Sequence, residues 1–272
     1  MAFLAMPQPF SFELTTERFR VFSPDLVNLW SDGALHRVVD GREVRIAEAE
    51  GGVEVEPLDD GIAVLVRRLL GAEFDLDAFQ PADQVLAQTA KRLHGFRPPI
   101  APDPFELLVG AVTAQQISLR AALAVRNRFV ERFGVRGDRA YAFPARERVA
   151  SLAPEDLTSL GFSRRKAACV IGLAGSEIDF DALRRLPDDE VKETLVRLPG
   201  IGEWTADWFL ARHLARPRAW PAGDLALRYA VSALYGDGRV LSIGETRELG
   251  SRFDPFQNLT AHYLLVAHRN PG

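Results

Sequence analysis

A tight turn between two helical segments is the feature that most constrains the fold of this chain. In "RLPGIGEWTAD", residues 197–207, a run with helical periodicity ends at Leu198, a turn follows at Pro199-Gly200-Ile201-Gly202, and a helix restarts at once. Glycine adopts a positive φ without strain, and its missing Cβ lets the backbone approach a ligand closely. The stretch therefore predicts a helix–hairpin–helix.

The second helix of this hairpin begins with N–H groups that have no partner within the helix, and such groups favour an anion. The predicted donors surround Gly200, Gly202 and Glu203, while Leu198 and Ile201 point into the core. A dinucleotide-binding G-x-G would follow a strand and need a third glycine, and a plain αα-hairpin would need no ligand. A nucleic-acid phosphate makes the best use of the donors. The predicted contact residues here are Gly200, Gly202, Glu203 and Thr205.

Two tryptophans and an aspartate follow the turn. Trp204 and Trp208 are four residues apart and share one helix face. Such a pair is usually part of a core, but indoles also stack on bases and attract cations. Asp224 precedes the apolar run "LALRYAV" as an N-cap does. A carboxylate held near a phosphate-binding hairpin is suited to stabilise positive charge on a deoxyribose, as in glycosidic bond cleavage.

The charge distribution is uneven although the net charge is only −4. Residues 1–100 carry 16 Asp and Glu against 10 Lys and Arg, and residues 101–272 carry 21 against 23. Basic residues cluster at 120–139 and at Arg164-Arg165-Lys166. Arginines that merely solvate helix faces would give the same pattern, so charge alone does not decide for DNA.

Hydrophobic periodicity predicts an α+β protein of two domains. Residues 1–95 carry strand signals in "PFSFELT", around Asp40-Gly41 and before a turn at Asp59-Asp60-Gly61, with a helix beginning at Ser23-Pro24. The proline-rich stretch at 96–104 is the predicted junction. Residues 96–272 are mostly helical. We therefore expect a small antiparallel sheet domain followed by a larger helical body.

Three segments together resemble the helix–hairpin–helix DNA glycosylase superfamily, and within it the 3-methyladenine branch. They are "LPGIGEWTAD" followed by Asp224, "FELLVGAVTAQQIS" at 105–118 and "LGFSRRKAACVIGLA" at 160–174. The β-rich segment before them is similar to the first domain of bacterial alkylation-repair glycosylases. The C-terminal segment departs from the family, because "NLTAHYLLVAHRN" has Leu265 near a position where the family often has tryptophan.

The resemblance implies roles by position. Asp224 matches the catalytic aspartate, either stabilising the oxocarbenium sugar or orienting water, and Trp204, Trp208 and Tyr263 match the base pocket. Gln115 or Gln116 falls at the wedge that fills the gap left by a flipped nucleotide, and Ser163, Arg164 and Lys166 are further DNA contacts. Relatives with a lyase step have lysine at the site of Trp204, so none is expected here. The backbone carbonyls of Val196, Leu198 and Ile201 match a monovalent cation site; no other cofactor is expected.

The resulting prediction is a monofunctional glycosylase that flips alkylated purines of the 3-methyladenine class out of duplex DNA and hydrolyses their bond to the sugar. A glycosylase for oxidised or deaminated bases, and a helix–hairpin–helix protein that binds damaged DNA without chemistry, are the alternatives. One cysteine, Cys169, allows no internal disulfide and no four-thiolate cluster. We expect a cytoplasmic monomer with no membrane association.

Overall fold

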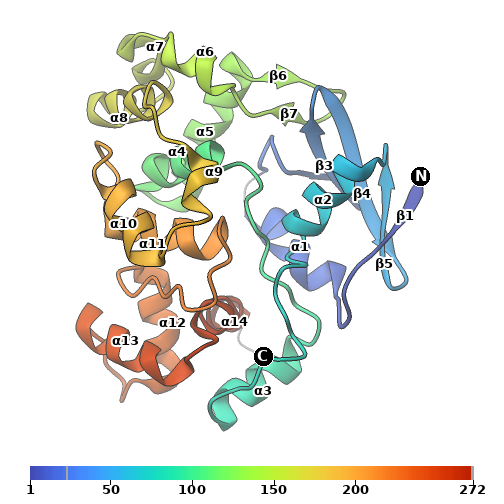
Figure 1. Cartoon of the computed structure of the whole chain (residues 1–272), viewed down its shortest axis with the longest axis vertical. Helices are drawn as coiled ribbons and strands as arrows, with labels where there is room; N and C mark the ends of the chain where they lie inside the picture. Colours follow the sequence, from blue (N-terminus) through green and yellow to red (C-terminus); the bar gives the residue numbers. More distant parts are fainter. Residues whose placement is uncertain (23, 271–272) are drawn as a thin grey trace.

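A five-stranded antiparallel sheet forms one side of the molecule (Figure 1). The computed structural model describes residues 1–22 and 24–270. The strands lie in the order β1-β5-β4-β3-β2. Their bounds are β1 (Ala2–Ala5), β2 (Leu29–Ser31), β3 (Ala34–Val39), β4 (Arg42–Ala49) and β5 (Gly52–Glu56). The predicted hairpin at Asp40-Gly41 is confirmed: both residues have positive φ, 48° and 73°, and they join β3 to β4.

Two local predictions in this region are wrong, because a side-chain cap begins a helix in each. The predicted turn at Asp59-Asp60-Gly61 is a helix start, because Asp59 accepts a hydrogen bond from the Ile62 N–H at 2.9 Å and caps α2 (Asp60–Leu69). Part of the predicted strand "PFSFELT" lies in α1 (Phe12–Val21), which Ser11 caps through the Leu14 N–H at 3.2 Å. Alternation of apolar residues was outweighed by the cap in both cases.

The predicted helix beginning at Ser23-Pro24 does not form. Ser23 lies outside the described residues, and the chain after it runs without helix into β2. The backbone of Leu26 bonds instead to the helical body: its carbonyl accepts from the Tyr141 N–H at 2.8 Å and its N–H donates to Asn127 at 3.3 Å. Contacts with residues more than 100 positions away override the local helix signal.

Helices build the rest of the molecule (Figure 1). The α+β prediction, a small antiparallel sheet followed by a mostly helical body, is confirmed. A two-stranded hairpin, β6 (Val135–Arg136) with β7 (Tyr141–Ala142), reaches from the body toward β3. The helices are α3 (Gln84–Arg92), α4 (Pro104–Ala114), α5 (Leu119–Phe133), α6 (Arg146–Ala150), α7 (Pro154–Thr158), α8 (Arg164–Ala174), α9 (Phe180–Leu183), α10 (Asp188–Val196), α11 (Glu203–Arg212), α12 (Leu225–Tyr235), α13 (Ile243–Gly250), a 3-10 turn (Ser251–Phe253) and α14 (Gln257–Arg269).

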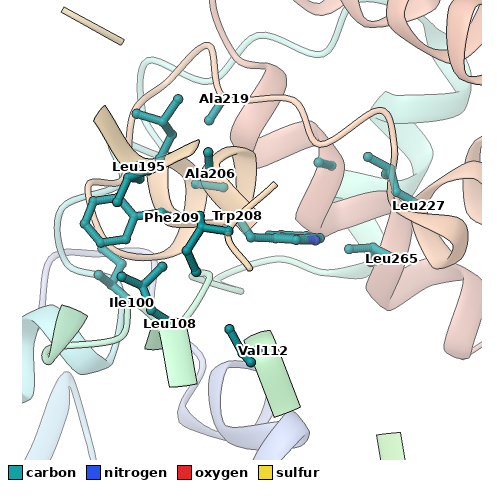
Figure 2. Packing of buried hydrophobic residues seen from close by; sticks show 14 of the residues in the cluster. Ile100, Leu108, Val112, Leu195, Ala206, Trp208, Phe209, Ala219, Leu227 and Leu265 are labelled. Carbon is teal, nitrogen blue, oxygen red and sulfur yellow. The ribbon is translucent and has the colours of Figure 1, made fainter. Parts of the chain in front are cut away.

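Two hydrophobic cores hold the fold together. The smaller one packs α1 and α2 against the sheet. The larger one fills the helical body, and Trp208 lies within it among Val112, Leu227 and Leu265 (Figure 2). Leu86 and Leu93, which come from the segment predicted as the first domain, also belong to the larger core. The domain boundary at 95/96 stays a prediction.

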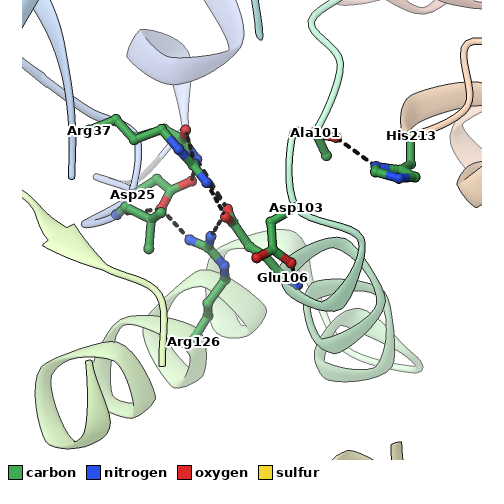
Figure 3. A network of polar contacts seen from close by, with 9 residues as sticks. Asp25, Arg37, Ala101, Asp103, Glu106, Arg126 and His213 are labelled. Carbon is green, nitrogen blue, oxygen red and sulfur yellow. Dashed lines mark hydrogen bonds and ion pairs between the residues drawn. The ribbon is translucent and has the colours of Figure 1, made fainter. Parts of the chain in front are cut away.

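Buried ion pairs connect the sheet to the helical body (Figure 3). Glu106 on α4 binds Arg37 of β3 at 2.6 Å and Arg126 of α5 at 2.7 Å. Arg126 also pairs with Asp25, which precedes β2. The charge of Arg126 holds the pKa of Asp25 below its usual value although burial opposes this. The network connects the two parts of the chain, and its residues also line a cavity between them.

Within the described residues, no helix is both long enough and apolar enough to cross a membrane.

Candidate active site

The helix–hairpin–helix is formed by α10, the turn and α11, as the sequence predicts. Gly200 has φ +82°, a conformation that favours glycine. A Cβ at this position would overlap the sulfur of Cys169 on α8, so the turn also requires glycine for packing. Lys192 of α10 and Asp207 of α11 pair at 2.8 Å and brace the two helices against each other. An ion pair and close packing against α8 thus hold the hairpin in place.

The start of α11 is left without a side-chain cap. Gly202 occupies the N-cap position and offers no hydrogen-bond acceptor, whereas Ser163 caps α8 and Asp224 caps α12. Gly202 is exposed, and a Cβ added to it would meet nothing within 4 Å. The first N–H groups of α11 thus open onto a bare surface, which suits an anion held by the backbone.

Asp224 is held by donors on both of its carboxylate oxygens. Oδ1 accepts from the Leu227 N–H at 2.9 Å, which is the predicted N-cap bond. Oδ2 accepts the indole N–H groups of Trp204 at 2.8 Å and Trp208 at 2.9 Å. Three N–H donors orient a carboxylate that is half-buried. This gives a fixed negative charge, the property needed beside a cation that forms during reaction.

The carboxylate borders a cavity of about 500 Å³. Trp204 and Trp208 line it together with Asp224, and the walls are mostly apolar side chains of α1, α4, α5 and α14. The volume falls within the range of small-molecule pockets, roughly 300–1,000 Å³. The three residues that the sequence singles out at 204, 208 and 224 thus meet at one cavity wall.

Tyr263 does not line this cavity, so its assignment to a base pocket is wrong. Its side chain is 3% exposed, its hydroxyl donates to the Phe96 carbonyl at 3.2 Å, and its ring packs on Phe79. Tyr263 lies on α14, and from this helix His262, Leu265 and Val266 line the cavity instead. The helix is buried along nearly its whole length, so no amphipathic pattern distinguishes the cavity-facing positions.

The guanidinium of Arg212 stacks on the ring of Trp208 in a cation–π contact. The Cζ atom of Arg212 lies 3.7 Å from the centre of the Trp208 ring, one helical turn away on α11. Trp208 is 4% exposed, whereas Trp204 is half-buried and keeps more of its ring accessible. The expectation that both indoles attract a cationic base therefore has support only for Trp204. The i, i+4 spacing of Trp208 and Arg212 was the sequence signal for this contact.

The adjacent glutamines after α4 have different environments. Gln115 is half-buried, and its Nε2 donates to the Gly200 carbonyl at 2.9 Å, which ties α4 to the hairpin. Gln116 is exposed and has φ +59°, an uncommon conformation for a residue other than glycine. Gln116 is thus the member of the pair whose side chain is exposed to solvent. The next residue, Ile117, is 41% exposed.

Some of the remaining predicted DNA contacts are exposed, whereas others are buried or hydrogen-bonded within the protein. Ser163 and Arg164 are exposed at the start of α8, and Glu203 is exposed at the start of α11. Lys166 donates to the Thr113 carbonyl at 2.8 Å. The Thr205 side chain is 1% exposed on the inner face of α11, so the prediction that it contacts DNA is wrong for the side chain.

The monovalent cation site predicted at the hairpin concerns three backbone carbonyls. Val196 ends α10, where carbonyls lack helical partners, and the Leu198 carbonyl accepts one bond, from the Ile201 N–H at 3.1 Å. Among the described residues no cluster of three or more His, Cys, Asp or Glu side chains could hold a metal. That the carbonyls of Val196, Leu198 and Ile201 hold a monovalent cation stays a prediction.

Comparison with known proteins places this site in a family. The family described as "HhH-GPD superfamily base excision DNA repair protein" matches residues 109–252. The DNA-3-methyladenine glycosylase of Bacillus subtilis is 31% identical over 206 residues, which span 70% of this chain and 68% of that protein.

Two solved structures are similar over most or all of the fold. The 3-methyladenine DNA glycosylase from Archaeoglobus fulgidus matches with a TM-score of 0.87 and 29% identity over 100% of both chains. The Schizosaccharomyces pombe 3-methyladenine DNA glycosylase, solved in complex with abasic DNA, matches with a TM-score of 0.59 and 27% identity over 69% of this chain and 92% of that one.

Proposed function

The chain belongs to the HhH-GPD superfamily of base excision DNA repair proteins, and from this premise we propose that it is a DNA glycosylase that releases alkylated bases from duplex DNA. The observation that carries the proposal is the carboxylate of Asp224, fixed by two indole N–H groups at the edge of a base-sized cavity. The names of the relatives, 3-methyladenine DNA glycosylases, support the same substrate class.

DNA binding in this proposal centres on the hairpin. The uncapped N–H groups after Gly202 hold a backbone phosphate, with Glu203 at the edge, and the start of α8 at Ser163 and Arg164 holds a second one. A monovalent cation on the carbonyls of Val196, Leu198 and Ile201 would add positive charge at the hairpin. Gln116 enters the duplex where the nucleotide leaves, because its side chain is free while that of Gln115 is bonded.

The chemistry assigned to Asp224 is electrostatic. As the bond between C1′ and the base nitrogen breaks, its electron pair leaves with the base and the sugar becomes an oxocarbenium ion. The fixed carboxylate stabilises that positive charge, or orients the water that then bonds to C1′ and loses a proton. The products are a free base and an abasic sugar in an unbroken strand.

The enzyme carries out no lyase step in this proposal. A strand-nicking glycosylase needs an amine that forms a Schiff base with C1′. Where lyase relatives have lysine, this chain has Trp204, whose N–H donates to Asp224. The amine of Lys166, on α8, donates to the Thr113 carbonyl.

A duplex with one N7-methylguanine tests both parts of the proposal. We expect release of the base and strand breakage only when an abasic-site endonuclease is then added under mild conditions, and we expect no protein–DNA adduct when sodium borohydride is added during the reaction. Breakage without the endonuclease, or a trapped adduct, would contradict the monofunctional assignment. Tight binding with no base release would favour a non-catalytic damage-binding protein.

A further inference from the structure

The side chain of Lys166 joins the first turn of α8 to the last turn of α4. Its Nζ donates to the Thr113 carbonyl at 2.8 Å, across 53 residues of sequence. The last carbonyls of a helix have no partner within the helix. Among the described residues no backbone N–H bonds to the Thr113 carbonyl, so Lys166 supplies its hydrogen bond.

The charge of Lys166 suits the end of α4 better than the start of α8. A helix start favours negative charge, and a helix end favours positive charge. The first turn of α8 nevertheless holds Arg164, Arg165 and Lys166 and no acidic residue, while the last turn of α4 has no basic residue of its own. The two arginines are exposed, whereas Lys166 is half-buried, and burial lowers the pKa of its amine. Lys166 therefore serves α4 as a cap.

This cap lies at the base of the turn that carries Gln116. The turn leads from α4 to α5, and Gln116 within it has a positive φ of 59°, a strained conformation that persists only where the surroundings fix it. The backbone bonds that close the turn, donated by the N–H groups of Gln115 and Ile117, are long at 3.4 and 3.5 Å. Side chains hold it on two sides instead: Lys166 from α8, and Gln115 through its bond to the hairpin.

We propose that Lys166 is a positioning residue: by holding the Thr113 carbonyl, it sets the turn from which Gln116 enters the duplex. The inference rests on the proposed function, because the entry of Gln116 belongs to it. It gives Lys166 a contact inside the protein in place of the predicted contact with DNA, while Ser163 and Arg164 keep their phosphate at the start of α8.

The test separates this role from a phosphate contact and from general support of the fold. Single-turnover excision of N7-methylguanine is measured opposite cytosine and opposite adenine, a mismatch that costs less to open. The variants are Lys166→Met, Lys166→Arg, Gln116→Ala, the double variant Lys166→Met with Gln116→Ala, and the control Lys91→Met at an exposed position on α3. Urea unfolding checks that each is folded, and Lys166→Gln replaces the Met variant if that one is not.

Binding to an intact duplex is measured for the same proteins at several salt concentrations, with Arg164→Met for comparison. Removing one phosphate contact lowers the slope of log K against log salt by about 0.9. We expect this change for Arg164→Met and an unchanged slope for Lys166→Met, because the lysine amine faces the Thr113 carbonyl.

In the excision assay we expect Lys166→Met to slow release from the stable pair about tenfold more than release from the mismatch, since the turn loses a charged hydrogen-bond donor. Lys166→Arg, which keeps a charged donor, should stay closer to the wild type, and Lys91→Met should equal it. In the double variant, Lys166→Met should add little to the effect of Gln116→Ala, because both changes act through one side chain.

Two results would overturn the inference. A slope lowered in Lys166→Met as in Arg164→Met would make the lysine a phosphate contact, and equal losses on paired and mismatched lesions would make it a support of the fold only. If the wild type released no base, the proposed function would fail. Affinity for a duplex with a tetrahydrofuran abasic analogue, relative to the intact duplex, would still decide the inference, because a wedge fills that gap without chemistry. A lower relative affinity in Lys166→Met would support the positioning role, and an unchanged one would contradict it.

Discussion

The indole N–H of Trp204 donates to Asp224 Oδ2 over 2.8 Å, although 20 residues separate the two in sequence. With Trp208 on the same oxygen and the Leu227 N–H on the other, the carboxylate has three hydrogen-bond donors among the described residues. A carboxylate accepts on both oxygens, whereas an amide accepts on one and donates on the other. The site is therefore built for Asp and not for its isostere Asn.

Asp224→Asn should consequently destabilise the protein. In either orientation of the amide, its NH₂ group faces an N–H donor, from the two indoles or from Leu227. An unsatisfied or opposed buried polar group costs about 1–3 kcal/mol, and urea unfolding at neutral pH measures the loss. Asp237→Asn, at an exposed carboxylate in the loop after α12, is the matched control. A stability equal to that of the wild type would show that the indole bonds are not formed in solution.

Two glycines of the hairpin should respond differently to substitution. Gly200→Ala should lower the melting temperature, because φ is positive and the added Cβ overlaps Cys169. Gly202→Val should leave the fold intact, since the space around it is open, but should weaken binding to damaged and undamaged duplex alike. Fluorescence anisotropy with both duplexes checks the second expectation. Unchanged affinity in folded Gly202→Val would mean that the hairpin does not approach phosphate.

Gln115 and Gln116 differ in their surroundings, and we expect their substitution to have different effects. Gln116→Ala removes the free side chain and should slow excision from a stable base pair more than from a mismatch, which costs less to open. Gln115→Ala breaks the bond to the Gly200 carbonyl and should weaken DNA binding whatever the pair. Single-turnover rates on paired and mismatched lesions measure both. Equal losses for Gln116→Ala on the two substrates would argue against a wedge.

Two buried histidines should make the fold sensitive to acid. Burial lowers the pKa of His213 and of His262 to about 3, well below the usual histidine value of 6.5. Below pH 6.5 the unfolded chain takes up protons that the folded state refuses, so stability is lost as pH falls from about 6.5 toward about 3. At pH 5.5 the loss is about 1.4 kcal/mol for each histidine.

Urea unfolding at pH 7 and pH 5.5 tests this. His213→Gln should remove about half of the pH dependence, whereas His94→Gln, at an exposed position, should leave it unchanged. Equal stability of the wild type at both pH values would show that the two histidines protonate normally in the folded state.

The sequence was informative where local chemistry decides the structure. The glycines of the turn and the capping carboxylate of Asp224 each have a local reason to be where they are, and both were predictable. The sheet hairpin at Asp40-Gly41 follows from the same kind of signal. Trp204 and Trp208 were recognised as a shared face, but the bonds from both to one oxygen depend on how α11 packs against α12.

What was missed depends on packing between distant segments. Tyr263 and Leu265 lie on a helix that is buried on all sides, so the sequence does not show which of them faces the cavity. Arg212 was within reach, because its spacing from Trp208 is visible, but its place at the wall of the cavity depends on how α11 packs against the other elements. The loss of the helix after Ser23 likewise comes from bonds to residues 127 and 141.

The central claim is that this protein releases alkylated bases through the carboxylate of Asp224, and assaying free base from methylated duplex DNA tests it most directly. DNA treated with a methylating agent is incubated with the wild type and with Asp224→Asn, and the small molecules released are separated and identified. At a temperature where the variant is folded and binds DNA, we predict free 3-methyladenine from the wild type and almost none from the variant. Base release by Asp224→Asn at the rate of the wild type, or none by a wild type that binds the same DNA, would contradict the account.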